Sequence, residues 1–309
     1  MNSKLVKGAL NTAERLKVPR SGDQSVLTVT KFFIEGLSNG ALALRASAIS
    51  FQLIMAFFPT IILLFSLIPY ISPDFQDLLL NYIFQVIPSE ATSLFGDTIK
   101  DLVMNKRQGI LSITFIFVFY YSSRAVSAIL AAFSESVNLV NKRHPIRQFL
   151  VSLLIMLMLS VLVITALALI TASDWLAAYL GDLDIIGDSI QRVGFYVLNY
   201  LMVLFLFMLA ISILYNMGNV DDKTWTIFSA GTLTTAVSMI LLSLGFASYI
   251  TRFATYNQLY GYVGSIIIFC LWLYFNSMVL LIGFELNASI SKGIMLEKIG
   301  EHSPVVKKE

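Results

Sequence analysis

The chain has 309 residues, of which 57% are hydrophobic and 13% charged, and its formal net charge is +2. Soluble domains carry roughly twice that share of charged residues, so the composition excludes an ordinary soluble or disordered protein. It indicates an integral membrane protein.

Six apolar segments follow one another along the chain, each long enough to cross a bilayer core of about 30 Å as a helix. None alternates with period two over its length, which argues against the strands of a barrel. The sequence therefore predicts an all-α, polytopic membrane helical bundle with six transmembrane helices, at residues 41–71, 110–133, 149–171, 195–215, 227–250 and 261–290.

Lys and Arg residues set the expected orientation. Fourteen lie in the N-terminal arm, the second and fourth connections and the tail, against five on the other side. We therefore predict that both termini are cytoplasmic. The predicted domains are a basic arm (1–40), a transmembrane domain (41–290) and a tail (291–309). The arm is expected to meet membrane lipids, including anionic headgroups, rather than nucleic acid.

Two outer connections, 72–109 and 172–194, are long enough to have structure. The first carries an amphipathic helical pattern, which fits a helix at the interface or a lid over the bundle, through Leu94, Phe95, Ile99, Leu102 and Val103. The second is acidic but lacks the spacing of a calcium loop, so no metal site is predicted from Asp174, Asp182, Asp184 and Asp188.

Three ionisable residues lie inside predicted spans, where a charge costs about 3 kcal/mol on insertion scales. They are Arg45 in the first helix, Arg124 deep in the second and Glu285 in the last. Arg45 and Glu285 could instead extend to nearby headgroups. For Arg124, a transport site and a structural salt bridge both remain open.

Polar residues also share helix faces. In the first helix, Arg45, Gln52 and Pro59 recur every seven residues, and the proline is expected to kink the helix. In the last helix, Gly283 and Asn287 lie on one face and Glu285 nearly opposite, so this helix is expected to be central. The candidate polar site comprises Arg124, Glu285, Asn287, Arg45 and Gln52, and close packing is expected at Gly261, Gly264 and Gly283.

Catalytic chemistry is scarce. The two histidines, His144 and His302, belong to no zinc motif, and no phosphate-binding loop of the ATPase type occurs. The single cysteine, Cys270, excludes an intrachain disulfide. We predict a protein that is not an enzyme and needs no metal or cofactor.

Several motifs together resemble those of the YihY/virulence factor BrkB family. They are Ala48-Ile-Ser-Phe-Gln-Leu-Ile-Met-Ala-Phe-Phe-Pro59, Tyr260-Gly261-Tyr262-Val263-Gly264, and Trp272 and Tyr274 followed by Leu281-Ile-Gly-Phe-Glu285-Leu-Asn287. Asn138 and Arg147 also fit the second cytoplasmic connection. Phe284 departs from the small residue usual there, and Gly264 lacks a following glycine. By this resemblance Glu285 and Asn287 are the strongest site candidates and Arg45 the weakest.

The resemblance implies a multi-pass protein of the bacterial inner membrane. Some members have carried a ribonuclease label, which the absent metal motif in this chain opposes, and lipid or solute movement has been suspected. We expect a secondary or passive transporter or flippase for a lipid or envelope-related solute, with an anionic headgroup drawn to Arg124 and Glu285 pairing with that arginine when the site is empty. The alternative is a non-catalytic structural or regulatory membrane partner. A homo-oligomer is left open.

Overall fold

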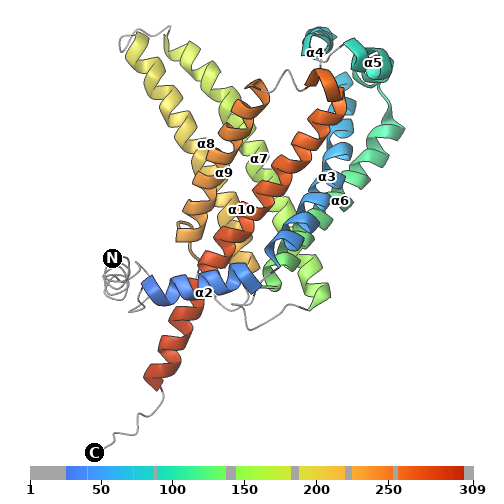
Figure 1. Ribbon diagram of the computed structural model, residues 1–309. Coiled ribbons are helices and arrows are strands. Elements are labelled where there is room, and N and C mark those ends of the chain that lie inside the picture. The colour runs from blue at the N-terminus through green and yellow to red at the C-terminus, as the bar shows by residue number, and fades with distance from the viewer. Residues whose placement is uncertain are drawn as a thin grey trace, which may run out of the picture. The chain divides into compact units, whose positions relative to one another are not determined.

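The computed structural model describes residues 26–39, 41–71, 73–86, 89–136, 144–181, 188–219, 225–252 and 257–302. Within these residues the chain is helical and has no strand (Figure 1). Six helices are long and apolar enough to cross a membrane, with spans at Leu42–Tyr70, Gln108–Ser134, Pro145–Ile170, Val197–Gly218, Ala230–Tyr249 and Ile266–Met295. The predicted all-α fold with six transmembrane helices is confirmed.

Each helix satisfies its backbone hydrogen-bonding groups internally, as a bilayer requires. Their bounds are α2 (Val26–Asn39), α3 (Leu42–Leu67), the short 3-10 turn η1 (Ile68–Tyr70), α4 (Pro73–Val86), α5 (Ser89–Met104), α6 (Gln108–Ser134), α7 (Pro145–Gly181), α8 (Asp188–Gly218), α9 (Ala230–Arg252) and α10 (Asn257–His302).

Three segments that the sequence prediction places outside the spans contain helix. The outer connection expected at 172–194 is partly helical, because α7 continues to Gly181 and α8 already begins at Asp188. The arm contains a helix, α2. The last helix has 46 residues, about 69 Å at 1.5 Å each, and therefore extends into the segment expected as a tail. In Figure 1 its C-terminal part continues past α2.

The chain divides into two compact units. The small unit, Ser50–Ala125, contains most of α3, η1, α4, α5 and the first part of α6. Its own core is formed by Ile68, Leu80 and Val103, against which Phe65, Leu79, Phe84 and Ile99 pack. The amphipathic helix expected in the first outer connection is thus confirmed as α5, which packs on α4 and η1.

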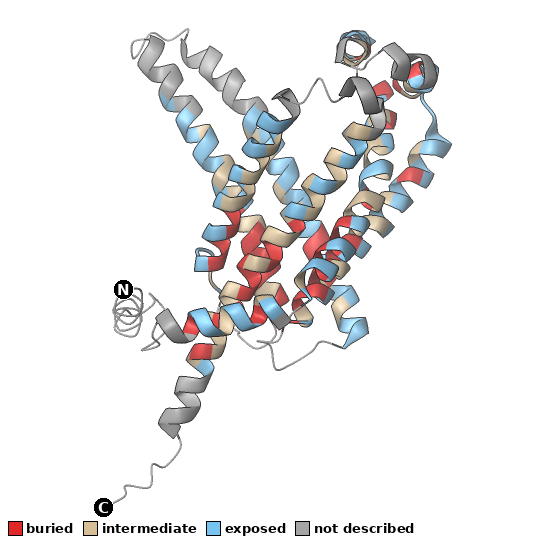
Figure 2. Cartoon of the chain, in the orientation of Figure 1, coloured by how far each residue is buried: buried red, intermediate tan, exposed pale blue. Residues whose placement is uncertain are grey.

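The large unit, Met1–Ile49 and Val126–Glu309, contains the other helices. Here α10 packs on α9 and α2, and α8 packs on α7 and α9. Buried residues gather at one end, where α6 and α8 finish and α9 begins, which we call the closed end (Figure 2). In the other half of α7–α10, no residue is buried at 157–170, 197–207, 237–249 or 266–276.

Candidate functional site: a buried ion pair on the last helix

The turn between α2 and α3 positions the first charged residue of the site. Ala41 has φ 45°, in the left-handed region that residues with a Cβ atom rarely adopt. It redirects the chain from α2 into α3, and its carbonyl oxygen accepts a hydrogen bond from the backbone N–H of Arg45, 3.1 Å away. Arg45 therefore lies in the first turn of α3.

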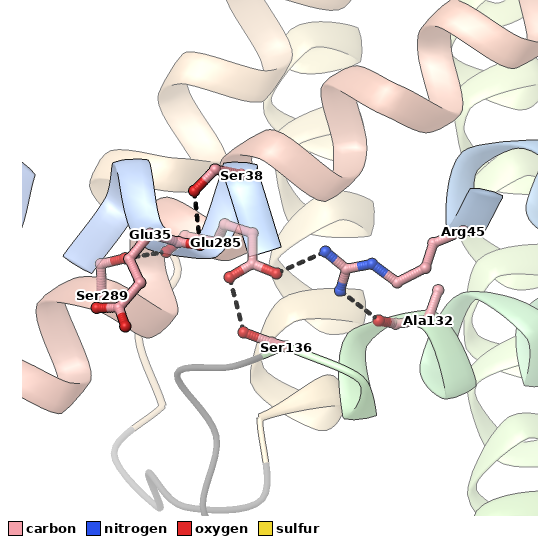
Figure 3. A network of polar contacts seen from close by, with 7 residues as sticks. All are labelled: Glu35, Ser38, Arg45, Ala132, Ser136, Glu285 and Ser289. Atoms are coloured by element: carbon pink, nitrogen blue, oxygen red, sulfur yellow. Dashed lines mark hydrogen bonds and ion pairs between the residues drawn. The ribbon is translucent and has the colours of Figure 1, made fainter. Parts of the chain in front are cut away.

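An ion pair joins Arg45 to Glu285 in the closed end (Figure 3). The guanidinium Nη2 lies 2.7 Å from Glu285 Oε1, and the side chains are 7% and 0% exposed. The other carboxylate oxygen, Oε2, accepts a hydrogen bond of 2.7 Å from the Ser136 hydroxyl. Together with Ser136, the ion pair thus connects α3 and α10 to the segment that directly follows α6.

Arg45 also completes the end of α6. Its Nη1 donates to the carbonyl oxygen of Ala132 at 2.8 Å. The last four carbonyls of a helix have no partner within the helix, and the C-terminal end carries partial negative charge. A buried arginine at this position is therefore stabilised by α6 as well as by Glu285.

One donor of the cluster stays unsatisfied. Arg45 Nε is buried and finds no hydrogen-bond acceptor among the described residues. A buried donor without a partner costs about 1–3 kcal/mol. The polar cluster is therefore closed but incompletely satisfied.

The opposite face of α10 is neutral and serves a different purpose. Asn287 Oδ1 accepts from the backbone N–H of Gly231 at 2.8 Å, and its Nδ2 donates to the Ser229 hydroxyl at 2.7 Å. Ser229 itself accepts from the backbone N–H of Thr232 at 3.1 Å, as a helix N-cap does. Asn287 therefore caps α9 from the neighbouring helix.

Close packing also joins α9 to this face of α10, and we call this contact the seam. A methyl group on Gly283 would collide with the Thr235 and Tyr215 hydroxyls and with the Gly231 carbonyl oxygen. The Tyr215 hydroxyl donates to the Leu280 carbonyl oxygen at 2.7 Å and lies 2.6 Å from the Thr235 hydroxyl. The contact between α9 and α10 thus leaves no room for a side chain at position 283.

An aromatic cluster fills the space between the two polar faces. Phe133 and Phe284 stack with ring centres 4.0 Å apart and an angle of 6° between planes. Tyr215 meets both edge-on, at 5.7 Å from Phe133 and 5.8 Å from Phe284. The unusual Phe284 is therefore explained by this stack, which joins α6, α8 and α10.

The structure brings together only some of the predicted site residues. Glu285 pairs with Arg45 and not, as expected, with Arg124. Burial also contradicts the reading in which Arg45 or Glu285 extends to headgroups. Asn287 lies on the other face of α10, as predicted, and this helix contacts α2, α9, the start of α3 and the end of α6.

The remaining predicted residues are not members of this cluster. Arg124 and Gln52 belong to the small unit, where Arg124 is exposed and Gln52 part-buried. Pro59 lies inside α3 and Gly261 and Gly264 inside α10, and the kink and the close packing expected there stay predictions. Asn138 falls outside the described residues.

Ser136 and the Gly231 backbone were missed by the sequence reasoning. A serine just after a helix and a glycine at the start of one carry no local signal of a distant partner. Tyr215, whose hydroxyl lies near the end of a mostly apolar helix, was a detectable sign of a buried polar contact.

The described residues contain no group of three His, Cys, Asp or Glu side chains placed to hold a metal ion.

Comparison with known proteins identifies the family of the chain. A family model described as Virulence factor BrkB matches residues 33–305. No solved structure matches the chain.

Three similar curated proteins illustrate the range of relatives. A protein of Bacillus subtilis named as the ribonuclease-like protein YfkH is 25% identical over 256 residues, 80% of this chain and 90% of its own. A UPF0761 membrane protein of Aliivibrio salmonicida is 24% identical over 220 residues, 70% of this chain and 67% of its own. One of Nitrosospira multiformis is 42% identical over 67 residues, 22% of this chain and 16% of its own. With six apolar helices and a family match over most of its length, the chain is a multi-pass membrane protein that belongs to the virulence factor BrkB family.

Proposed function

We propose that this protein is a passive or secondary translocator of the bacterial inner membrane, which moves a lipid or another envelope-related solute. The Arg45–Glu285 pair is its gate, at the closed end of the large unit. The observation that carries the proposal is that two opposite charges, 7% and 0% exposed, join three helices at this end.

A buried ion pair is a poor way to stabilise a membrane bundle. Apolar residues of similar volume often stabilise a protein as well or better, because two charges must be removed from water. Charges within membrane spans are accordingly functional candidates by default. A pair that can separate and become hydrated supports a gate better than a fixed contact.

The incomplete satisfaction of Arg45 points the same way. Its Nε has no acceptor among the described residues while the pair is closed. Opening the gate to water would satisfy this donor, which offsets part of the cost of separating the charges. The free-energy difference between the closed state and a hydrated, open state is therefore small enough for the gate to open.

The uneven packing of the large unit supports movement at one end. The closed end contains an unbroken buried run, Ile211–Tyr215 in α8, whereas no described residue of the same helix is buried at 197–207. Helices that are packed only at the closed end are held together mainly by the contacts of that end, so opening the ion pair there would let them separate. In the orientation that the Lys and Arg distribution predicts, the closed end faces the cytoplasm.

Exchange of a labelled lipid between leaflets tests the proposal. Proteoliposomes would contain a fluorescent phosphatidylglycerol, and wild type would be compared with the apolar pair Arg45→Met/Glu285→Met. We expect exchange above empty vesicles for wild type. We expect a loss of at least tenfold for the apolar pair, whose opening to water is unfavourable, without loss of thermal stability. Wild-type exchange no faster than in empty vesicles would overturn the proposal for lipids.

A second candidate function is a non-catalytic structural or regulatory partner in the envelope. It is favoured by the opposite face of α10, where the Asn287 cap and the Gly283 contact are fully occupied by protein. Under this reading the ion pair only locks helices, and the apolar pair would behave as wild type in every assay. An enzymatic role is not proposed, and the ribonuclease-like name belongs to the relative that carries it.

A further inference from the structure

Arg124 is the single charged residue of α6 and lies well inside its span. It precedes the last residue, Ser134, by ten positions, which is about 15 Å along the helix axis. The Cα–Cβ bond of a helical residue tilts toward the helix N-terminus, which for Arg124 is away from the nearer end. The guanidinium is therefore held at a depth where a bilayer offers it little water.

This arginine is also exposed. No hydrogen bond or ion pair joins Arg124 to another residue in the part of the chain that the structure describes, in contrast to Arg45. An uncompensated charge at this depth costs about 2.5–3.5 kcal/mol on insertion scales. An anion supplied from outside the chain would remove that cost.

The surface around Arg124 on α6 is apolar and faces outward. Tyr120, Phe117 and Ile113 lie four, seven and eleven residues before it on the same face. They are 53%, 51% and 57% exposed. We call these three residues and Arg124 the α6 stripe. Its length, about 16 Å, is close to the thickness of one leaflet's hydrocarbon.

We infer that the α6 stripe binds a phospholipid, with Arg124 holding the phosphate and the apolar residues contacting an acyl chain. Arginine suits this ligand because its planar guanidinium donates two parallel hydrogen bonds to a phosphate. The exposed Tyr120 hydroxyl, one helical turn away, supplies a further donor. As a statement of the substrate class, this inference rests on the proposed translocation function.

Phospholipid is favoured over other anions by the depth and the composition of the stripe. A free anion in water would have to enter the hydrocarbon to reach Arg124, whereas a lipid carries its phosphate in with its chains. A headgroup bound at Arg124 lies below the normal headgroup level, as a lipid on its way between leaflets must. The chain thus offers a cation where a translocated phosphate needs one most.

Binding to the purified full-length protein in detergent tests the site without requiring transport. The probes are phosphatidylglycerol and a diacylglycerol with the same acyl chains, followed by native mass spectrometry. We expect wild type to retain phosphatidylglycerol in preference to diacylglycerol. Arg124→Gln should weaken phosphatidylglycerol binding about tenfold or more, as loss of a charge-assisted hydrogen bond implies. Arg124→Lys should weaken it less.

Arg147→Gln is the matched control, since Arg147 is also an exposed arginine but lies in the first turn of α7. It should leave phosphatidylglycerol binding unchanged. Unchanged binding by Arg124→Gln would overturn the inference. So would displacement of the lipid by inorganic phosphate, which indicates a free-anion site, or conversion of a dimer to a monomer by Arg124→Gln, which indicates an acidic partner on a second copy.

The two proposals fail separately. Phosphatidylglycerol bound through Arg124 without any leaflet exchange would overturn translocation and support the site. Leaflet exchange that is unchanged by Arg124→Gln would support translocation and overturn the site.

Discussion

The two faces of α10 use polar groups in opposite ways. Toward α3 and α6, Glu285 forms an ion pair with Arg45 and accepts a hydrogen bond from Ser136, and the cluster keeps an unsatisfied donor. Toward α9, Asn287 and the glycine contact form a neutral seam in which the amide of Asn287 has two partners. One helix therefore carries a charged face, which we propose can change state, and a neutral face that is fixed by its partners.

The difference shows how a membrane bundle can combine a fixed part with a movable one. Neutral hydrogen bonds and glycine contacts hold α9 and α10 together without the free-energy cost of removing charges from water. A charge pair is stable only while both partners are present, and its separation requires water. We expect variants of the two faces to differ in kind: seam variants should lower stability, and pair variants should alter exchange as well.

The largest effect is expected from Glu285→Gln. It leaves the Arg45 guanidinium buried beside a neutral amide, which should destabilise the fold by about 3 kcal/mol or more. Thermal unfolding of the purified protein measures this loss. A second change, Arg45→Met, should restore most of the stability, whereas Glu35→Gln, at an exposed glutamate of α2, should have little effect. Full stability of Glu285→Gln would show that the pair does not stabilise the closed end.

Gly283→Ala should destabilise the seam by about 1–3 kcal/mol, because the added methyl group forces α9 and α10 apart. The matched control is Gly245→Ala in α9, where an added Cβ would meet no atom within 4 Å. That change should be neutral or stabilising, since alanine favours a helix by up to about 1 kcal/mol over glycine. Equal effects of the two variants would contradict the close contact.

Asn287→Ala removes the cap that α10 provides to α9. We expect a loss of about 1–2 kcal/mol, the usual range for a helix cap and its hydrogen bonds. Asn276→Ala is the control, because Asn276 Nδ2 donates only to the Trp272 carbonyl oxygen of its own helix, at 2.8 Å. The seam would be in doubt if Asn276→Ala proved the more damaging change in thermal unfolding.

The smallest effect concerns the pH dependence of stability, and it arises in α5 rather than on either face of α10. Hydrogen bonds from Arg107 and Asn105, each 2.8 Å long, lower the pKa of Asp101 at the end of α5. A lowered pKa in the folded state stabilises the fold above the unfolded pKa, about 3.9, and this contribution is lost as the pH falls through the folded value. Asp101→Asn should therefore lower the Tm slightly at pH 7 and by less at pH 3. An equal shift at both pH values would contradict the pairing.

The sequence predicted the six spans well because length and apolar composition determine them directly. It also predicted that α10 is polar on two faces, since helical periodicity places Asn287 and Glu285 apart on the helix. The partner of Glu285 could not be predicted in the same way. Depth in the membrane favoured Arg124, but pairing depends on which helix ends meet, and that is set by the turn at Ala41 and the end of α6.

The candidate gate was therefore only half predictable. Glu285 was recognisable from its charge within an apolar segment. Arg45 was ranked low by the family resemblance, and its place close to a helix end also allowed extension to headgroups. Ser136 and the α6 carbonyl that completes the cluster belong to a helix terminus, whose unsatisfied groups are invisible to hydropathy.

Water access to Ser136 is the most direct measurement of whether the Arg45–Glu285 pair opens. Ser136 is 5% exposed and donates to Glu285, so a cysteine there, in a Cys270→Ser background, reports on the closed end. A membrane-impermeant thiol reagent would be applied to proteoliposomes during lipid exchange. A gate predicts that Ser136→Cys is labelled while exchange proceeds and that Arg45→Met/Glu285→Met suppresses the labelling and the exchange together. Exchange that proceeds at the wild-type rate while this cysteine stays unlabelled would contradict the account.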